Sequence, residues 1–191
     1  MTYKQRKALA YIIGVALGDG NLSNPNGRAV RLRITCDTKY PLIQADIISA
    51  LTILLPSNKI STTARAVTYC DISVYSNKFN NWLSWSSGEG TKLEQKPKIP
   101  AWILHKRPYL IQCLRGLLQS DGSIYFDRGY QMVNFTNHLD TLANSVYDMI
   151  TVLGYTPRLY KTASRDGRMK YTVRLARKVE DFLQLLKLRK A

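Results

Sequence analysis

Residues 12–20 read IIGVALGDG, and the same pattern returns at residues 114–122 as LRGLLQSDG. Each copy is a largely apolar stretch that ends at Asp-Gly. Both copies carry small residues four positions apart, which are Gly14 and Gly18 in the first and Gly116 and Ser120 in the second. Small residues at this spacing share one face of a helix and let two backbones approach closely. The repeat therefore predicts two helices that pack against each other.

Packed in this way, the helices would place two carboxylates, Asp19 and Asp121, side by side at their C-terminal ends. A helix C-terminus carries partial negative charge, and like charges held close together raise each other's pKa. A bound divalent cation resolves this conflict, and hard oxygen ligands suit Mg²⁺. One Asp-Gly alone would be an ordinary turn, but two copies after the same apolar pattern favour a Mg²⁺ site with Asp19 and Asp121 as ligands.

The charge of the chain points to a polyanionic partner. Its 191 residues carry a net charge of +15 and a pI near 9.9, while 45% of the residues are hydrophobic. A folded protein this basic most often binds nucleic acid. No apolar stretch approaches the ~20 residues of a membrane-spanning helix, and no long basic amphipathic helix indicates a membrane surface.

The cysteines and the N-terminus bear on the compartment. Cys36, Cys70 and Cys113 are scattered and odd in number, which fits free thiols in a reducing, intracellular compartment. Two histidines at these spacings exclude a structural zinc site. The basic residues before the first apolar stretch imitate a secretory signal peptide, but the internal copy at 110–122 argues against secretion.

The two motifs resemble the paired motifs of a LAGLIDADG homing endonuclease in its single-chain, two-repeat form. The resemblance covers nearly the whole chain, and it implies an α+β fold of two pseudo-symmetric αββαββα repeats. In that family the antiparallel sheets form a saddle over duplex DNA, and the motif helices pack at the repeat interface. The implied activity is a Mg²⁺-dependent double-strand break in a long target site, made by a monomer.

The rest of the chain fits this organisation. The order of pattern in residues 1–85 is helix, strands, helix, strands, helix, and residues 108–191 repeat it at low identity. Leu32, Ile34 and Thr35 correspond to Val133, Phe135 and Thr136. Residues 86–107 contain Gly and Pro and are the expected linker. Halves of this size bury only a modest fraction of their surface alone, so mutual packing is expected.

The expected strands have one apolar face and one polar, basic face. A face rich in Arg, Lys, Asn and Tyr suits phosphate and base-edge contacts, and a β-ribbon fits the major groove. The residues expected to bind DNA are Arg28, Arg31, Arg33, Thr35, Lys59, Ser61, Thr63, Arg65, Tyr69 and Ser73 in the first half, and Tyr130, Met132, Asn134, Thr136, Arg158, Tyr160, Lys170, Thr172 and Arg174 in the second.

Three further roles come only from the resemblance. It implies that the backbone carbonyls of Gly18 and Ser120 are additional metal ligands. It also implies a catalytic basic residue near the end of the first strand of each repeat, for which Lys39 and His138 are the candidates beside the catalytic Asp19 and Asp121. Asp37 stands close to where the family often has Lys, so the assignment of Lys39 departs from the family pattern.

The sequence leaves two other functions open. One is a nuclease-inactive DNA- or RNA-binding protein of the same fold, such as an intron maturase or a regulator. The other is a basic RNA-associated structural protein, which would need no paired carboxylates. For the endonuclease, Arg31 and Arg33 against Met132 and Asn134 predict an asymmetric target, with guanine in the first half-site and more A·T in the second.

Overall fold

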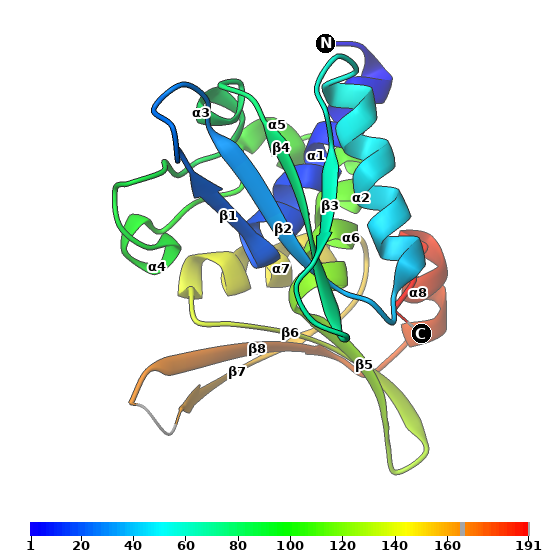
Figure 1. Cartoon of the computed structure of the whole chain (residues 1–191). Coiled ribbons are helices and arrows are strands. Elements are labelled where there is room, and N and C mark those ends of the chain that lie inside the picture. Colours follow the sequence, from blue (N-terminus) through cyan, green and yellow to red (C-terminus); the bar gives the residue numbers. More distant parts are fainter. Residues whose placement is uncertain (165–166, 191) are drawn as a thin grey trace.

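Two four-stranded antiparallel sheets and a pair of central helices make up the computed structural model, which describes residues 1–164 and 167–190 (Figure 1). The central helices are α1 (Tyr3–Asp19) and α6 (Arg107–Asp121). They pack along each other, and each leads directly into the first strand of one sheet. This arrangement confirms the α+β fold of two αββαββα repeats with the motif helices between them.

The first repeat continues after α1 with six elements. They are β1 (Gly20–Ser23), β2 (Arg31–Asp37), α2 (Pro41–Leu54), β3 (Ser61–Ala64), β4 (Tyr69–Tyr75) and α3 (Phe79–Trp82). The strand order in the sheet is β1-β2-β4-β3.

The second repeat has the same order of elements after α6. They are β5 (Gly122–Asp127), β6 (Tyr130–Asn137), α7 (Asp140–Val152), β7 (Arg158–Ala163), β8 (Met169–Leu175) and α8 (Val179–Leu186). The order β5-β6-β8-β7 reproduces the first sheet strand for strand. Between α3 and α6, the chain forms the short helices α4 (Lys92–Gln95) and α5 (Ala101–Leu104).

The motif helices have defined starts and ends. Thr2 and Gln5 form a capping box at the start of α1, in which each side chain accepts the other residue's backbone N–H. Pro108 lies in the first turn of α6, where its missing N–H costs nothing. Both helices end at a glycine, Gly20 or Gly122, with extended backbone that continues into a strand.

The predicted close approach of the motif helices is confirmed by their glycines. A Cβ added at Gly14 would lie 2.1 Å from the carbonyl oxygen of Cys113, and one at Gly116 would lie 2.4 Å from that of Tyr11. Neither space can hold a methyl group. The spacing read from the sequence therefore sets the distance between the two repeats.

Each sheet buries one face against the helices and leaves the other open. Leu32, Ile34, Ile72 and Val74 are fully buried under the first sheet, and Val133, Phe135, Val173 and Leu175 under the second. Because successive strand residues point to opposite faces, the residues between them lie on the open faces. These open faces carry the residues expected to contact DNA.

The structure corrects one local expectation, because Lys59 and Arg65 flank β3 rather than lying in it. Before the strand, the Asn58 amide donates to the carbonyl of Tyr75 (2.7 Å), where the ladder would continue. After the strand, the backbone N–H groups of Arg65 and Ala66 both donate to the carbonyl of Tyr69 and form the turn into β4.

Among the described residues, no helix combines the length and the apolar character that crossing a membrane would require. Ala191, the end of the expected second repeat, lies outside the described residues.

Candidate metal centre and nucleic-acid face

The ends of the two motif helices meet at the centre of the molecule. A Cβ added at Gly18 would lie 2.1 Å from the Ser120 hydroxyl oxygen and 3.2 Å from the carboxyl carbon of Asp121. Asp19 and Asp121 are the last residues of α1 and α6. The helix packing thus brings together the four residues expected to supply metal ligands.

The ionised forms of the two carboxylates are unfavourable in this position. Although the Asp19 side chain keeps contact with solvent, the surrounding protein desolvates it, and this effect together with the nearby Asp121 raises its pKa to about 6. Burial also raises the pKa of Asp121, against a hydrogen bond from the Asn137 amide (2.6 Å). Both carboxylates therefore favour a positive partner.

Two lysines that the sequence did not single out supply part of that positive charge. The Lys92 ammonium, from α4, donates to the carbonyls of Ala16 (3.2 Å), Leu17 (3.1 Å) and Gly18 (2.5 Å). The Lys190 ammonium donates to the carbonyl of Ser120 (2.6 Å). Burial lowers the pKa of both lysines, and the two aspartates oppose that shift. Each motif helix thus has one lysine at its C-terminal end.

This set of oxygens fits a hard divalent cation. Two carboxylates lie close to the carbonyls of Gly18 and Ser120. The ammonium groups of Lys92 and Lys190 contact these carbonyls, so positive charge is already present at the site. Mg²⁺ is bound through a few carboxylate and carbonyl oxygens plus water. The described residues contain no cluster of three or more His, Cys, Asp and Glu side chains, so a cation here would need carbonyl and water oxygens beside the two carboxylates.

Lys39 and His138 both lie close to this centre. Lys39 lines a cavity of about 390 Å³ together with Asp19, Gln119 and Lys190, and its ammonium is paired with Asp37 (2.9 Å). His138 lines a second cavity of about 280 Å³ with Lys92 and Asp121, and its Nδ1 lies 2.8 Å from the carbonyl of Met169. The two residues flank the carboxylate pair from opposite repeats.

The first open sheet face holds a buried acid among its basic residues. Asp71 is only 5% exposed and accepts hydrogen bonds from Thr35 (2.8 Å) and Arg65 (2.5 Å), with Arg33 at 3.9 Å. Burial would raise the pKa of Asp71, but the hydrogen bonds from Arg65 and Thr35 lower it. Asp71 therefore stays ionised and holds two expected DNA contacts in place, a role that the strand pattern alone did not indicate.

The second open sheet face is organised differently. The Asn134 side chain donates to the Tyr125 hydroxyl (3.1 Å) and accepts from the Arg174 Nε (3.2 Å). A bidentate contact of Asn134 with adenine would use the same side-chain NH2 group and oxygen, which are already engaged by Tyr125 and Arg174. Thr136 and Thr172 form a hydroxyl pair (3.2 Å) nearer the centre.

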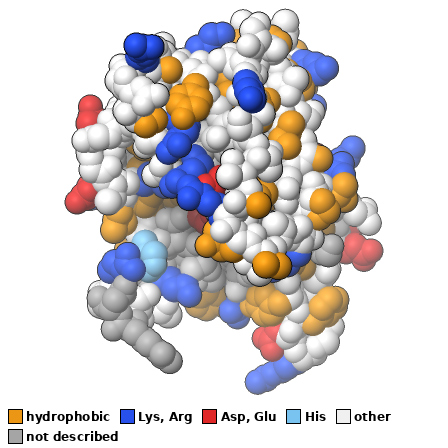
Figure 2. All heavy atoms as spheres, viewed as in Figure 1, with side chains coloured by type: hydrophobic (Ala, Val, Ile, Leu, Met, Phe, Trp, Pro, Cys, Tyr) orange, Lys and Arg blue, Asp and Glu red, His pale blue; other side chains and the backbone are white. Residues whose placement is uncertain are grey.

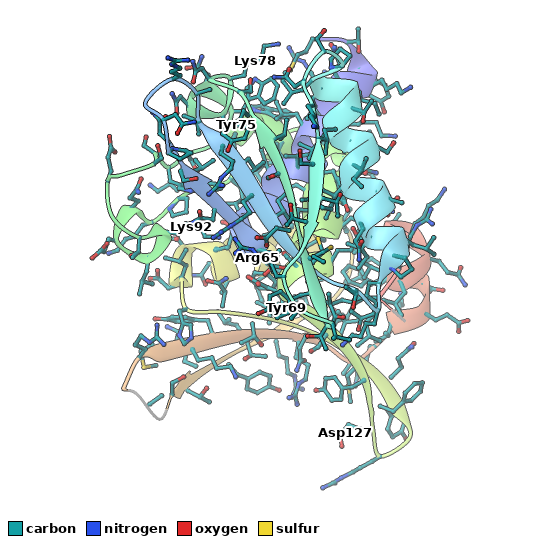
Figure 3. All side chains as sticks on the ribbon, in the orientation of Figure 1. Arg65, Tyr69, Tyr75, Lys78, Lys92 and Asp127 are labelled. Atoms are coloured by element: carbon teal, nitrogen blue, oxygen red, sulfur yellow. The ribbon has the colours of Figure 1, made fainter. Side chains whose placement is uncertain are left out.

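Basic side chains lie over the first sheet on the face of the molecule that Figure 2 shows. These Lys and Arg side chains lie beside a hollow that opens toward the second sheet. Figure 3 shows Arg65, Tyr69 and Tyr75 along the open side of the first sheet, and Asp127 at the tip of the β5–β6 hairpin. Lys59 and Arg28 lie exposed in loops beside the first sheet. Among the expected contacts, Thr35 shares a cavity with Asp19, and Thr136 shares one with Asp121.

Comparisons with known proteins agree with this geometry. Residues 109–187 match the family described as LAGLIDADG-like domain. Solved structures of mesophilic variants of the homing endonuclease I-DmoI match with a TM-score of 0.68 and 20% identity, over 96% of each chain. I-DmoI in complex with DNA and Mn matches with a TM-score of 0.67 and 19% identity, over 98% of each chain. The comparison with curated proteins found no match.

A second group of structures shares the fold. Full-length DUF199/WhiA from Thermatoga maritima has a TM-score of 0.67 and 10% identity, covering all of this chain and 58% of that one. The same fold is therefore found in a homing endonuclease and in DUF199/WhiA. Residues 109–187 thus match the LAGLIDADG-like domain, and the whole chain has the two-repeat LAGLIDADG fold seen in the structures of I-DmoI.

Proposed function

We propose that this protein is a site-specific DNA endonuclease that makes a metal-dependent double-strand break in a long, asymmetric target. The observation that carries the proposal is the pair of carboxylates at the joined helix ends, beneath two basic sheet faces. With one acidic residue per repeat, each half serves one strand of the duplex. The likeness to I-DmoI, solved with target DNA and with Mn, supports double-stranded DNA as the partner and a divalent metal as the cofactor.

The residues of the centre have distinct roles in this proposal. Asp19, Asp121 and the carbonyls of Gly18 and Ser120 would hold a divalent cation such as Mg²⁺. When bound, the metal activates water and stabilises charge on the scissile phosphate and the leaving oxygen. Lys92 and Lys190 stabilise negative charge that develops beside the carboxylates. Lys39 and His138, one from each repeat, orient water or phosphate oxygens.

One observation favours a second candidate, a nuclease-inactive DNA- or RNA-binding protein of the same fold. The ammonium groups of Lys92 and Lys190 already contact the carbonyls of Gly18 and Ser120. In such a binder the lysines would replace the metal permanently. Binding of Mn²⁺ to the purified protein, followed by calorimetry, separates the candidates, because only the nuclease needs a site that a divalent cation can enter.

The catalytic proposal is tested on duplexes that the wild-type protein retains from a random pool without Mg²⁺. Asp19→Asn and Asp121→Asn should each abolish double-strand cleavage after Mg²⁺ is added, while gel-shift affinity changes less than about tenfold because neither carboxylate contacts much DNA. Lys92→Met should lower cleavage by roughly 10²-fold or more. Full cutting by either Asn variant contradicts the assignment.

The control for these variants is Asp148→Asn, which removes an exposed carboxylate on α7 away from the helix ends. It should cleave like the wild type. Loss of cleavage in this variant as well would mean that the effect comes from net charge and not from the site.

A further inference from the structure

A pocket on the open face of the second sheet is lined mainly by side chains that donate hydrogen bonds or stack. Its volume is about 360 Å³, and its lining is Met132, Thr156, Arg158, Tyr160, Arg174, Ala176 and Arg177. No acidic residue is among these lining residues, all of which the structure describes. Three guanidinium groups around one pocket favour a ligand with negative charge or several hydrogen-bond acceptors.

The register of the sheet places two of these arginines directly opposite each other. Arg158 on β7 pairs with Arg174 on β8. Like charges at directly opposite positions destabilise an antiparallel pair. Arg158 lies on the edge strand and is exposed, whereas Arg174 lies on an inner strand and is half-buried. A ligand on this face would therefore reach Arg158 at the surface of the pocket and Arg174 deeper inside it.

Arg174 is held in a fixed orientation. Its Nε donates to the Asn134 oxygen (3.2 Å), and its guanidinium carbon lies 5.3 Å from the centre of the Tyr160 ring. Asn134 is itself oriented, because its amide donates to the Tyr125 hydroxyl (3.1 Å). Within residues 1–164 and 167–190, no other hydrogen bond to the Arg174 side chain is formed. Its terminal nitrogens are left for a ligand.

The first repeat has an arginine in the equivalent cross-strand pair, but on the other strand. There Arg33 on β2 faces Ser73 on β4, whereas in the second repeat Asn134 on β6 faces Arg174 on β8. Arg33 lies beside the buried Asp71 (3.9 Å), as Arg174 lies beside Asn134. Each half therefore presents one arginine in this cross-strand pair. Arg174 is held by a hydrogen bond to Asn134, whereas the Arg33 Nε is buried 3.9 Å from the Asp71 carboxylate and makes no hydrogen bond with the described residues.

We propose that Arg174 reads a guanine in the second half-site and that Arg33 reads the pseudo-equivalent guanine in the first. This inference rests on the proposed function. A guanidinium whose two terminal nitrogens are free and coplanar matches the O6 and N7 acceptors of guanine in the major groove. Asn134 is then a positioning residue for Arg174 and not a reader of adenine. Arg158 and Arg177, at the rim of the pocket, contact phosphates.

The test is a base-preference measurement on duplexes selected from a random pool by the wild-type protein. The wild type should require a G·C pair at one position in each half-site. Arg174→Ala should lose that preference by roughly 10- to 100-fold in the second half-site only, and Arg33→Ala in the first only. Asn134→Asp, which keeps an acceptor for the Arg174 Nε, should retain guanine, while Asn134→Ala should weaken the preference.

Arg177→Ala is the matched control at the same pocket, and it should weaken binding to all duplexes without changing any preference. The inference is overturned if Arg174→Ala also weakens all sequences evenly, which would mean a phosphate contact. It is equally overturned if the wild type selects adenine there and Asn134→Asp abolishes that choice. If the wild type enriches no sequence at all, the proposed function fails as well, so the two failures are distinguishable.

Discussion

Asp19 shows how a single carboxylate can oppose the stability of the protein that holds it. Its pKa is raised to about 6 by desolvation and by Asp121, against an ordinary value near 4 in an unfolded chain. A group with a raised carboxyl pKa binds more protons folded than unfolded, so its ionisation destabilises the folded state as pH rises from about 4 to about 6. At neutral pH the ionised Asp19 therefore lowers the free energy of unfolding of the metal-free protein.

We accordingly predict that Asp19→Asn raises the Tm of the metal-free protein at pH 7 but leaves it nearly unchanged at about pH 3, where the carboxyl is mostly protonated in both the folded and the unfolded state. Mg²⁺ should raise the wild-type Tm at pH 7 and have little effect on the variant. Thermal unfolding at the two pH values, with and without Mg²⁺, measures this. A variant less stable than the wild type at pH 7 would show that Asp19 makes a stabilising contact instead.

At this scale the sequence predicted the residues that belong to a local motif and missed those that do not. Asp19 and Asp121 end a pattern that occurs twice, so their meeting could be inferred. Lys92 reaches Gly18 across 74 residues and Lys190 reaches Ser120 across 70. Nothing near either lysine distinguishes it from the other basic residues. The role of Asp71 was likewise hidden, since its partners are Arg33 on the neighbouring strand β2 and Arg65 just after β3.

The pair of motif helices joins the two repeats through backbone contacts rather than through large side chains. Gly14 and Gly116 each lie against a carbonyl oxygen of the opposite helix. Alanine is a better helix former than glycine by roughly 1 kcal/mol. Here the added methyl group meets rigid backbone, and overpacking of this kind costs about 1–3 kcal/mol or more.

We predict that Gly14→Ala and Gly116→Ala each lower the free energy of unfolding by about 1–3 kcal/mol in spite of the gain in helix propensity. Cleavage should fall further than stability explains, because the helix ends carry both carboxylates. Chemical denaturation and single-turnover cleavage measure the two effects. Ala45→Ser adds one heavy atom at an exposed position of α2 and should be neutral. Wild-type stability in either alanine variant would contradict the packing described here.

Element types followed from local pattern more readily than element ends. The alternation of apolar and basic residues in β2 defined both faces of that strand, and the register confirms which residues share the open face. The limits of β3 did not follow, because the Asn58 side chain takes the backbone acceptor of Tyr75. Such a competition between side chain and backbone depends on the neighbouring strand and leaves no periodic signal in the sequence.

The whole molecule repeats one plan around a pseudo-twofold axis, and this is why its fold could be predicted from low internal identity. A pattern that occurs twice constrains both copies, since each strand of one sheet has a counterpart in the other. The differences between the halves lie on the open faces. Asp71 organises the arginines of one face, while Asn134 and Tyr160 organise Arg174 on the other.

The net charge of +15 acts at the scale of the whole molecule. Each phosphate that a Lys or Arg neutralises releases condensed counterions and contributes about −0.9 to the slope of log K against log salt. We therefore predict a steep salt dependence of DNA binding. Lys170→Ala, on the open face of β8, should make that slope less steep by about 1.

Lys4→Ala is the matched control, because Lys4 is exposed in the first turn of α1, at the opposite end of that helix from Asp19. It removes the same charge from the molecule and should leave the slope unchanged, since a distant charge is screened beyond a Debye length of about 10 Å at 0.1 M salt. Fluorescence anisotropy titrations over a range of KCl concentrations give both slopes. Equal slopes for the two variants would mean that DNA responds to net charge alone, and the open sheet faces would then not be the binding surface.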